Sequence, residues 1–244
     1  MRWQAIRQSC TVAGMTWHTL GSPYGTPDLL ALGMLAVSWF AIGWIIEHPP
    51  KVRPSVSTLM VAFRKDWMRQ FVTRQPRIFD ATMIDSLRQG TAFFASACMI
   101  ALGGGVALMG NPAGLMNVTQ DFAPAGSSDG IEFRIIPLLL FLADALLKFI
   151  WSHRLFGYCA IIMAAVPNDP ADPLAYHRAA QAAEINITAA RNFNRGLRSV
   201  YFALAALAWL FGAVPLLGAT ALCLAVLIRR EFASESRAVL LRKP

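Results

Sequence analysis

Residues 28–46 read DLLALGMLAVSWFAIGWII, a run without a charged side chain after its first position. At a rise of about 1.5 Å per residue, a helix of this length covers the roughly 30 Å hydrocarbon core of a bilayer. Pro27 and Asp28 are typical of a helix start, and the polar segment Glu47-His48-Pro49-Pro50 ends the run. The stretch therefore predicts a first membrane-spanning helix.

Three further apolar runs follow, over residues 89–109, 135–166 and 199–228. The whole chain is 56% hydrophobic and only 15% charged, whereas a soluble domain is about one quarter charged. We predict an all-α integral membrane protein with about four transmembrane helices. It is expected to form a single membrane domain, with an N-terminal tail (1–27), a helical bundle (28–235) and a basic tail (236–244).

Two other segments show helical periodicity without being apolar throughout. Residues 55–75 place Val56, Leu59, Phe63 and Trp67 on one face and arginines on much of the rest, which predicts a basic amphipathic helix. This helix is expected to lie at the membrane interface, and packing on a neighbouring helix is the alternative. Residues 174–197 carry one polar stripe and predict a long cytoplasmic helix, with Asp172 and Pro173 at its start.

The last apolar run, residues 199–228, is too long for one crossing and too short for two. Its 30 residues make a helix of about 45 Å, against roughly 30 Å of hydrocarbon. Either one long helix protrudes from the membrane, or the chain breaks near Gly212–Pro215 and returns as a re-entrant hairpin. One long helix is the preferred interpretation.

The distribution of Lys and Arg predicts the orientation. Segment 47–88 holds eight basic residues and segment 167–198 holds four, whereas 110–134 holds one. Because basic loops stay in the cytoplasm, we expect these two segments inside and the N-terminus in the periplasm of a bacterial inner membrane. With four crossings, the C-terminal tail would lie outside despite its five basic residues.

Two charged clusters are candidate sites. Asp144 and Lys148 lie four residues apart inside an apolar run, with Arg154 further along, and predict either an intramembrane functional site or a structural ion pair. The second cluster is expected to bind anionic lipid or an acidic partner on the cytoplasmic side, or else only to fix orientation. Its members are Arg191, Arg195 and Arg198 with Arg64, Lys65 and Arg69.

The sequence contains no recognisable catalytic motif. HExxH, GxSxG, phosphate-loop and dinucleotide fingerprints are absent, so no catalytic, cofactor-binding or metal-binding residue is predicted and an enzyme is not favoured. The net charge of +8 comes from residues that flank apolar runs, which favours anionic lipid over nucleic acid as the partner.

Several strings together carry a family resemblance. They are Arg64-x-x-Trp67-Met68, Arg77-Ile78-x-Asp80, Phe93-Phe94-Ala95-Ser96, Lys148-x-x-Trp151-x-x-Arg154, Phe193-Asn194-Arg195-Gly196-Leu197-Arg198 and Arg229-Arg230-Glu231-Phe232. Over roughly residues 28–235 the chain resembles the bacterial integral-membrane family called domain of unknown function 599. The resemblance implies a membrane bundle and adds no activity. We expect an accessory or scaffold component that binds lipid or protein partners, as a homo-oligomer or in a larger membrane complex. The alternative is a small transporter or channel that uses Asp144 and Lys148.

Overall fold

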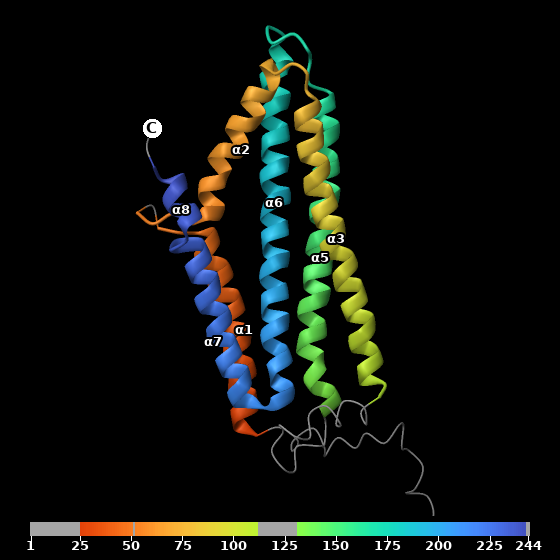
Figure 1. Ribbon diagram of the computed structural model, residues 1–244, viewed down its shortest axis with the longest axis vertical. Helices are drawn as coiled ribbons and strands as arrows, with labels where there is room; N and C mark the ends of the chain where they lie inside the picture. The colour runs from red at the N-terminus through yellow and green to blue at the C-terminus, as the bar shows by residue number, and fades with distance from the viewer. Residues whose placement is uncertain (1–24, 51, 112–130, 243–244) are drawn as a thin grey trace, which may run out of the picture.

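The computed structural model describes residues 25–50, 52–111 and 131–242, and these residues form helices and connecting turns without any strand. The N-terminal tail and most of the 110–134 loop lie outside the described residues. The elements, shown in Figure 1, are α1 (Thr26–Glu47), α2 (Val56–Thr73), α3 (Ile78–Met109), η2 (Ile131–Ile135), α5 (Ile136–Ala164), α6 (Pro173–Leu207), η3 (Ala208–Phe211), α7 (Ala213–Phe232) and α8 (Glu235–Leu240).

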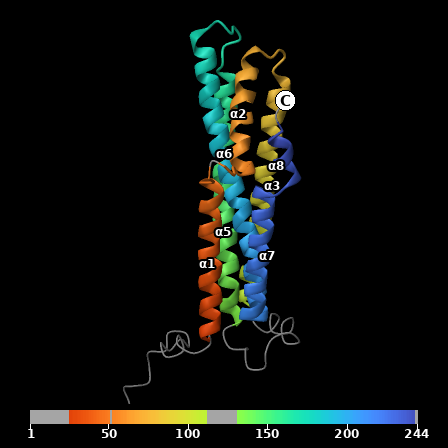
Figure 2. The ribbon, with the colours of Figure 1, turned by 90° about the vertical axis from the view of Figure 1, so that its left-hand side faces the viewer.

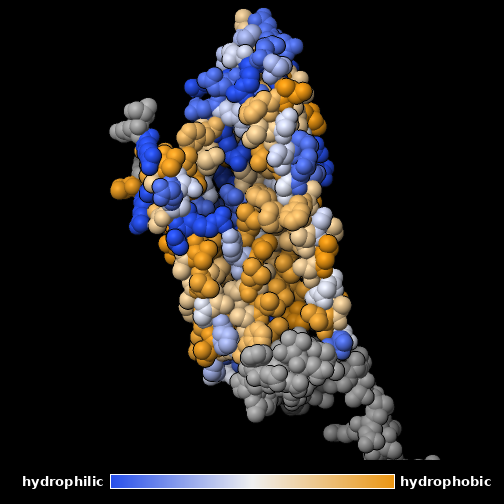
Figure 3. Space-filling model, in the orientation of Figure 1, coloured by the Kyte–Doolittle hydropathy of each residue, from blue (hydrophilic) through white to orange (hydrophobic). Residues whose placement is uncertain are grey.

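The helices form one elongated bundle with a lower and an upper half. In the lower half, α1 and α7 lie along one side of α6, with α5 and α3 on its other side, and in the upper half α2 takes the place of α1 and α7 beside α6 (Figures 1 and 2). The lower half is largely apolar at its surface, whereas hydrophilic side chains gather in the upper half (Figure 3). Among the residues that the structure describes, three segments are long and apolar enough to cross a membrane, namely Thr26–Glu47, Ile78–Met109 and Ala213–Leu240.

The central helix is α6, which contacts α1, α2, α5 and α7. Small side chains allow this close packing, and Ala175, Ala179, Ala182 and Ala183 are all buried. At Gly196, an added Cβ would lie only 2.7 Å from Cε1 of Phe149 on α5. The 35 residues of α6 make a helix of about 52 Å, so it extends well beyond a hydrocarbon core of about 30 Å.

The preferred interpretation of residues 199–228 as one long helix is wrong. The chain leaves α6 at Leu207, passes through η3 and turns at Gly212, whose φ of 110° favours glycine. Then α7 runs back along α1 and α6 (Figure 1). The break and return of the hairpin alternative are therefore confirmed, but the hairpin is not confined to residues 199–228. Its two arms are full-length helices because α6 starts far before Ser199 and α7 continues to Phe232.

The predicted amphipathic helix is α2, and it packs on α6. The side chain of Ser55 caps it by accepting a hydrogen bond from the backbone N–H of Thr58. Its buried residues are Met68, Phe71 and Val72, and the helix continues up the bundle beside α6 (Figure 1). The structure therefore shows the packing alternative, and contact of its exposed face with lipid stays a prediction. Asp172 caps α6 as predicted, accepting a hydrogen bond from the N–H of Leu174 at 2.7 Å.

Candidate functional site: a cationic cavity

A cavity of about 720 Å³ opens where α1 ends and α2 begins. Its walls are the last residues of α1, the first half of α2, the middle of α6 and the last turn of α7. Figure 3 shows hydrophilic side chains around a hollow at this level, directly above the apolar half of the surface. Segments far apart in the sequence therefore meet at the boundary between the apolar and polar halves.

Among the charged side chains in the wall of this cavity, basic ones outnumber acidic ones. The basic residues are Arg64, Lys65, Arg191, Arg198 and Arg230, and the acidic residues are Glu47 and Glu231. The cavity thus has a surplus of three positive charges. Such a surplus is unfavourable in a partly dehydrated space unless an anion enters it.

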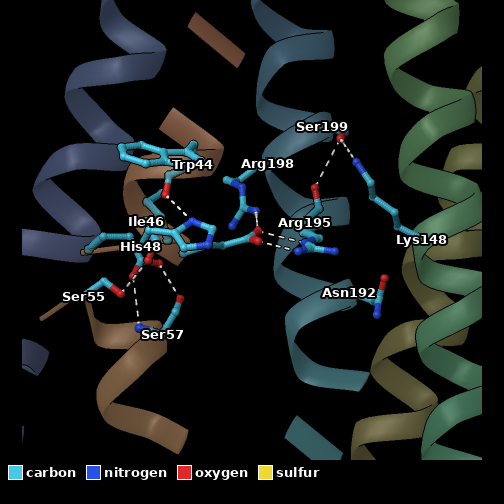
Figure 4. A network of polar contacts seen from close by, with 12 residues as sticks. Trp44, Ile46, His48, Ser55, Ser57, Lys148, Asn192, Arg195, Arg198 and Ser199 are labelled. Atoms are coloured by element: carbon cyan, nitrogen blue, oxygen red, sulfur yellow. Dashed lines mark hydrogen bonds and ion pairs between the residues drawn. The ribbon is translucent and has the colours of Figure 1, made fainter. Parts of the chain in front are cut away.

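Glu47 is fully engaged by two arginines of α6. Nε of Arg195 donates to its Oε1 at 2.8 Å, and the terminal nitrogens of Arg195 and Arg198 form ion pairs with the two carboxylate oxygens. Figure 4 shows both arginines pointing from α6 toward the end of α1. The Glu47 carboxylate therefore ties α1 to α6 and leaves little capacity for a further cation.

Glu231 is engaged as well, by the start of α2. Its carboxylate accepts hydrogen bonds from the backbone N–H of Ser57 at 3.1 Å and from the Ser57 hydroxyl at 3.0 Å. A carboxylate at a helix N-terminus is favourable because the free N–H groups carry partial positive charge. Glu231 thus holds α7 against α2.

Three arginines of the wall contact no carboxylate among the described residues. Arg64 donates to the neutral amide oxygen of Asn186, and Arg230 donates to the hydroxyl of Tyr201. The side chain of Arg191 has no hydrogen bond or ion pair with the part of the chain that the structure describes. Burial lowers the pKa of Arg64, and no carboxylate opposes this shift. These three guanidiniums are the groups available to an anion.

Guanidinium groups are suited to phosphate and carboxylate, because their planar N–H donors match two oxygens at once. The cavity is large enough for a phosphate with a substituent. Within residues 25–50, 52–111 and 131–242, no group of three His, Cys, Asp or Glu residues is placed to hold a metal ion.

The structure brings together most of the predicted cationic cluster. Arg64, Lys65, Arg191 and Arg198 line the cavity, and Arg195 reaches it through Glu47. Arg69 does not line it: it borders a separate groove between α2 and α6, where Lys65 pairs with Glu184 at 3.0 Å. Local sequence patterns do not identify Arg230 and Glu231, which only the return of α7 brings to this level, nor Tyr201 of α6, to whose hydroxyl Arg230 donates.

The second predicted cluster is an ion pair within α5, which a hydroxyl of α6 contacts. Nζ of Lys148 lies 2.5 Å from Oδ2 of Asp144, and the Ser199 hydroxyl donates to the same carboxylate (Figure 4 shows Lys148 and Ser199). Lys148 also lies 5.0 Å from the ring centroid of Trp39 on α1. Arg154 is not part of this cluster, because it is exposed and its Nε donates to the hydroxyl of Tyr158.

Comparison with known proteins gives one result. The model of the family described as a protein of unknown function, DUF599, matches residues 30–236. No curated protein and no solved structure shows significant similarity to the chain.

Proposed function

Because this chain belongs to the family of unknown function DUF599, we propose its function from its own geometry: it is a non-enzymatic membrane protein that binds the head group of an anionic lipid. The head group lies in the cavity between α2, α6 and α7. In this role the protein is an accessory or scaffold component whose attachment to anionic lipid fixes its polar half at the membrane surface.

The observation that carries the proposal is the set of three arginines without a carboxylate partner. Arg64, Arg191 and Arg230 come from three different helices and line one cavity. Anionic lipid attracts each basic group near the surface by about 1 kcal/mol. The cavity also lies at the upper end of α1, where the apolar surface gives way to the polar one (Figure 3).

The proposal includes an orientation in a bacterial inner membrane. We place the N-terminus in the periplasm and the cavity on the cytoplasmic side, with α1, α3, α5, α6 and α7 crossing the membrane. The return of α7 supports this orientation, because it brings the basic C-terminal segment to the same end as segments 47–88 and 167–198 (Figure 1). All the strongly basic segments then lie inside, as expected for membrane proteins.

Lipid retention by variants tests the proposal. The Arg64→Gln/Arg191→Gln protein should retain phosphatidylglycerol roughly thirtyfold more weakly in native mass spectrometry, since two charges supply about 2 kcal/mol. The matched control is Arg69→Gln/Arg242→Gln, which removes two exposed cations that do not line the cavity. Equal retention of phosphatidylglycerol by the two double variants contradicts the proposal. Finding an acidic protein bound at the cavity in place of lipid contradicts it as well.

A second candidate function, a small transporter or channel, is favoured by the charged pair Asp144–Lys148 inside an apolar helix. Intramembrane ionisable groups commonly mark a transport path. Here, however, the two side chains satisfy each other, Ser199 bonds to both, and Lys148 is also placed over the ring of Trp39. This arrangement favours a structural ion pair, and transport is the lesser proposal.

A further inference from the structure

An apolar groove lies between α6 and α7 on the lower half of the bundle. It encloses about 210 Å³ and is lined by Tyr201, Leu204, Ala205, Ala219, Leu222 and Val226, among others. Leu204 and Leu222 are exposed at its rim, whereas Ala205 is buried in its wall. A groove of this kind in an apolar surface fits a hydrocarbon chain and offers nothing to a free inorganic anion.

The groove begins where the cationic cavity ends. Arg230 lines the cavity and Tyr201 lines the groove. The Arg230 guanidinium donates to the Tyr201 hydroxyl and lies 5.6 Å from the centroid of its ring. One contact therefore joins the polar and the apolar site.

The groove leads away from the cavity along both helices. On α6 it passes from Tyr201 to Ala205, and on α7 from Val226 to Ala219, a distance of about 6–10 Å. These residues continue into the apolar half of the bundle, and the α7 part lies in one of the three segments able to cross a membrane. Tyrosine is common at the level of lipid head groups, which matches Tyr201 at the top of the groove.

We infer that the two sites bind one molecule, an anionic phospholipid whose phosphate lies in the cavity and whose acyl chain lies in the α6–α7 groove. The inference rests on the proposed function and adds the position of the chain. It follows from the continuity of the sites at Arg230–Tyr201 and from the match of a cationic and an apolar part to an amphiphile.

The groove positions the lipid more than it strengthens binding. An acyl chain that leaves the bilayer for the groove exchanges one apolar surrounding for another, so packing is the only gain. The arginines therefore account for most of the affinity, and the groove determines which helices the chain touches.

Photo-crosslinking tests this assignment. The full-length protein is reconstituted in vesicles that contain phosphatidylglycerol with a diazirine in the middle of one acyl chain, and the labelled peptides are mapped after irradiation. Labelling should concentrate in residues 204–226 of α6 and α7. In Ala219→Phe, whose ring fills the groove, this labelling should fall severalfold. It should stay unchanged in Ala221→Phe, because Ala221 is exposed and does not line the groove.

The outcomes separate the two proposals. Labelling spread evenly over α1, α3 and α7 of the unmodified protein overturns the groove assignment, and retention by the arginine variants still decides the head-group proposal. A third outcome is that millimolar inorganic phosphate displaces lipid from the cavity while α6 and α7 are not preferentially labelled. This result identifies a free anion as the ligand and also overturns the groove assignment. Loss of groove labelling in Arg64→Gln/Arg191→Gln supports a single lipid in both sites.

Discussion

Glu47 connects α1 to α6 at the boundary of the bundle. The carboxylate ends α1, pairs with Arg195 and Arg198 of α6, and lies in the wall of a cavity that α2 closes. The Arg198 side chain is only 10% exposed, so little water is available to replace a lost partner. Removing one partner of such a pair destabilises the fold, because the remaining charge is then buried without a partner.

Replacing Glu47 tests this account of the boundary. Glu47→Ala leaves two guanidiniums without their acceptor and should lower the free energy of unfolding by about 2 kcal/mol, measured by thermal unfolding in detergent. The control is Glu184→Ala, which breaks a pair whose side chains are 56% and 64% exposed and should cost about 0.5 kcal/mol. Equal losses from the two substitutions are incompatible with this role of Glu47.

The pair Asp144–Lys148 gives a second prediction at this scale. Asp144→Ala leaves Lys148 with only the Ser199 hydroxyl and the Trp39 ring, and should lower stability by about 3 kcal/mol. Asp144→Leu/Lys148→Leu removes both charges and should recover more than half of that loss. If the double variant is as unstable as the single one, the structural role is wrong and the transport proposal gains support.

At the scale of elements, glycine decides how α5, α6 and α7 are arranged. Gly212 supplies the positive φ that lets the chain reverse after η3. Gly196 lets α6 approach Phe149, a fully buried ring that also packs against Phe94 and Phe193. Small residues are the common means of close helix packing in membranes, where apolar surface alone gives no preference for protein over lipid.

The contact at Gly196 can be tested with a matched glycine. Gly196→Ala places a methyl group against the Phe149 ring, which its neighbours prevent from moving, and should cost about 2 kcal/mol of unfolding free energy. Gly157→Ala, on α5, meets no atom within 4 Å and should stabilise the protein by about 0.5 kcal/mol. A neutral Gly196→Ala in the same assay would show that α5 and α6 are not closely packed there.

Local sequence patterns predict most elements and fewer of their contacts. Apolar runs predict α1 and the span in α3, and the cap residue Asp172 predicts the start of α6. The spacing of four residues predicts the ion pair between Asp144 and Lys148. Local patterns do not favour the reversal at Gly212, because the packing of α7 on α1 and α6, which stabilises it, is not contained in any local pattern.

The same limit applies to the candidate site. The stripe of Arg191, Arg195 and Arg198 can be recognised from helical spacing, but its partner Glu47 lies about 150 residues earlier in the chain. Arg230 reaches the cavity only once α7 has returned along the bundle. Local spacing therefore identifies several basic residues of the cavity. Which of its arginines lack a carboxylate partner can be recognised only from tertiary contacts.

At the scale of the whole molecule, the bundle separates into an apolar half and a cationic half. The described ends of α1, α7 and α2 meet at the boundary, and the strongly basic segments lie on its upper side (Figures 1 and 3). Because α7 returns, the number of crossings in the proposed arrangement is odd. The two termini are then on opposite sides of the membrane.

Reporter fusions test this arrangement. A fluorescent reporter that folds only in the cytoplasm should be active when fused after Arg74 and also when fused after Leu241. The same reporter should be inactive when inserted in the 117–130 loop, where a periplasmic phosphatase should be active instead. An inactive reporter after Leu241 would contradict the proposal that α7 crosses the membrane back to the cytoplasmic side. An inactive reporter after Arg74 would show that the proposed orientation is reversed.

The binding of an anionic head group is the central claim, and a structure in lipid nanodiscs with phosphatidylglycerol tests it most directly. The account predicts phosphate density in the cavity, within hydrogen-bonding distance of Arg64, Arg191 and Arg230. Ordered lipid on the apolar surface together with only water between these three arginines would contradict it.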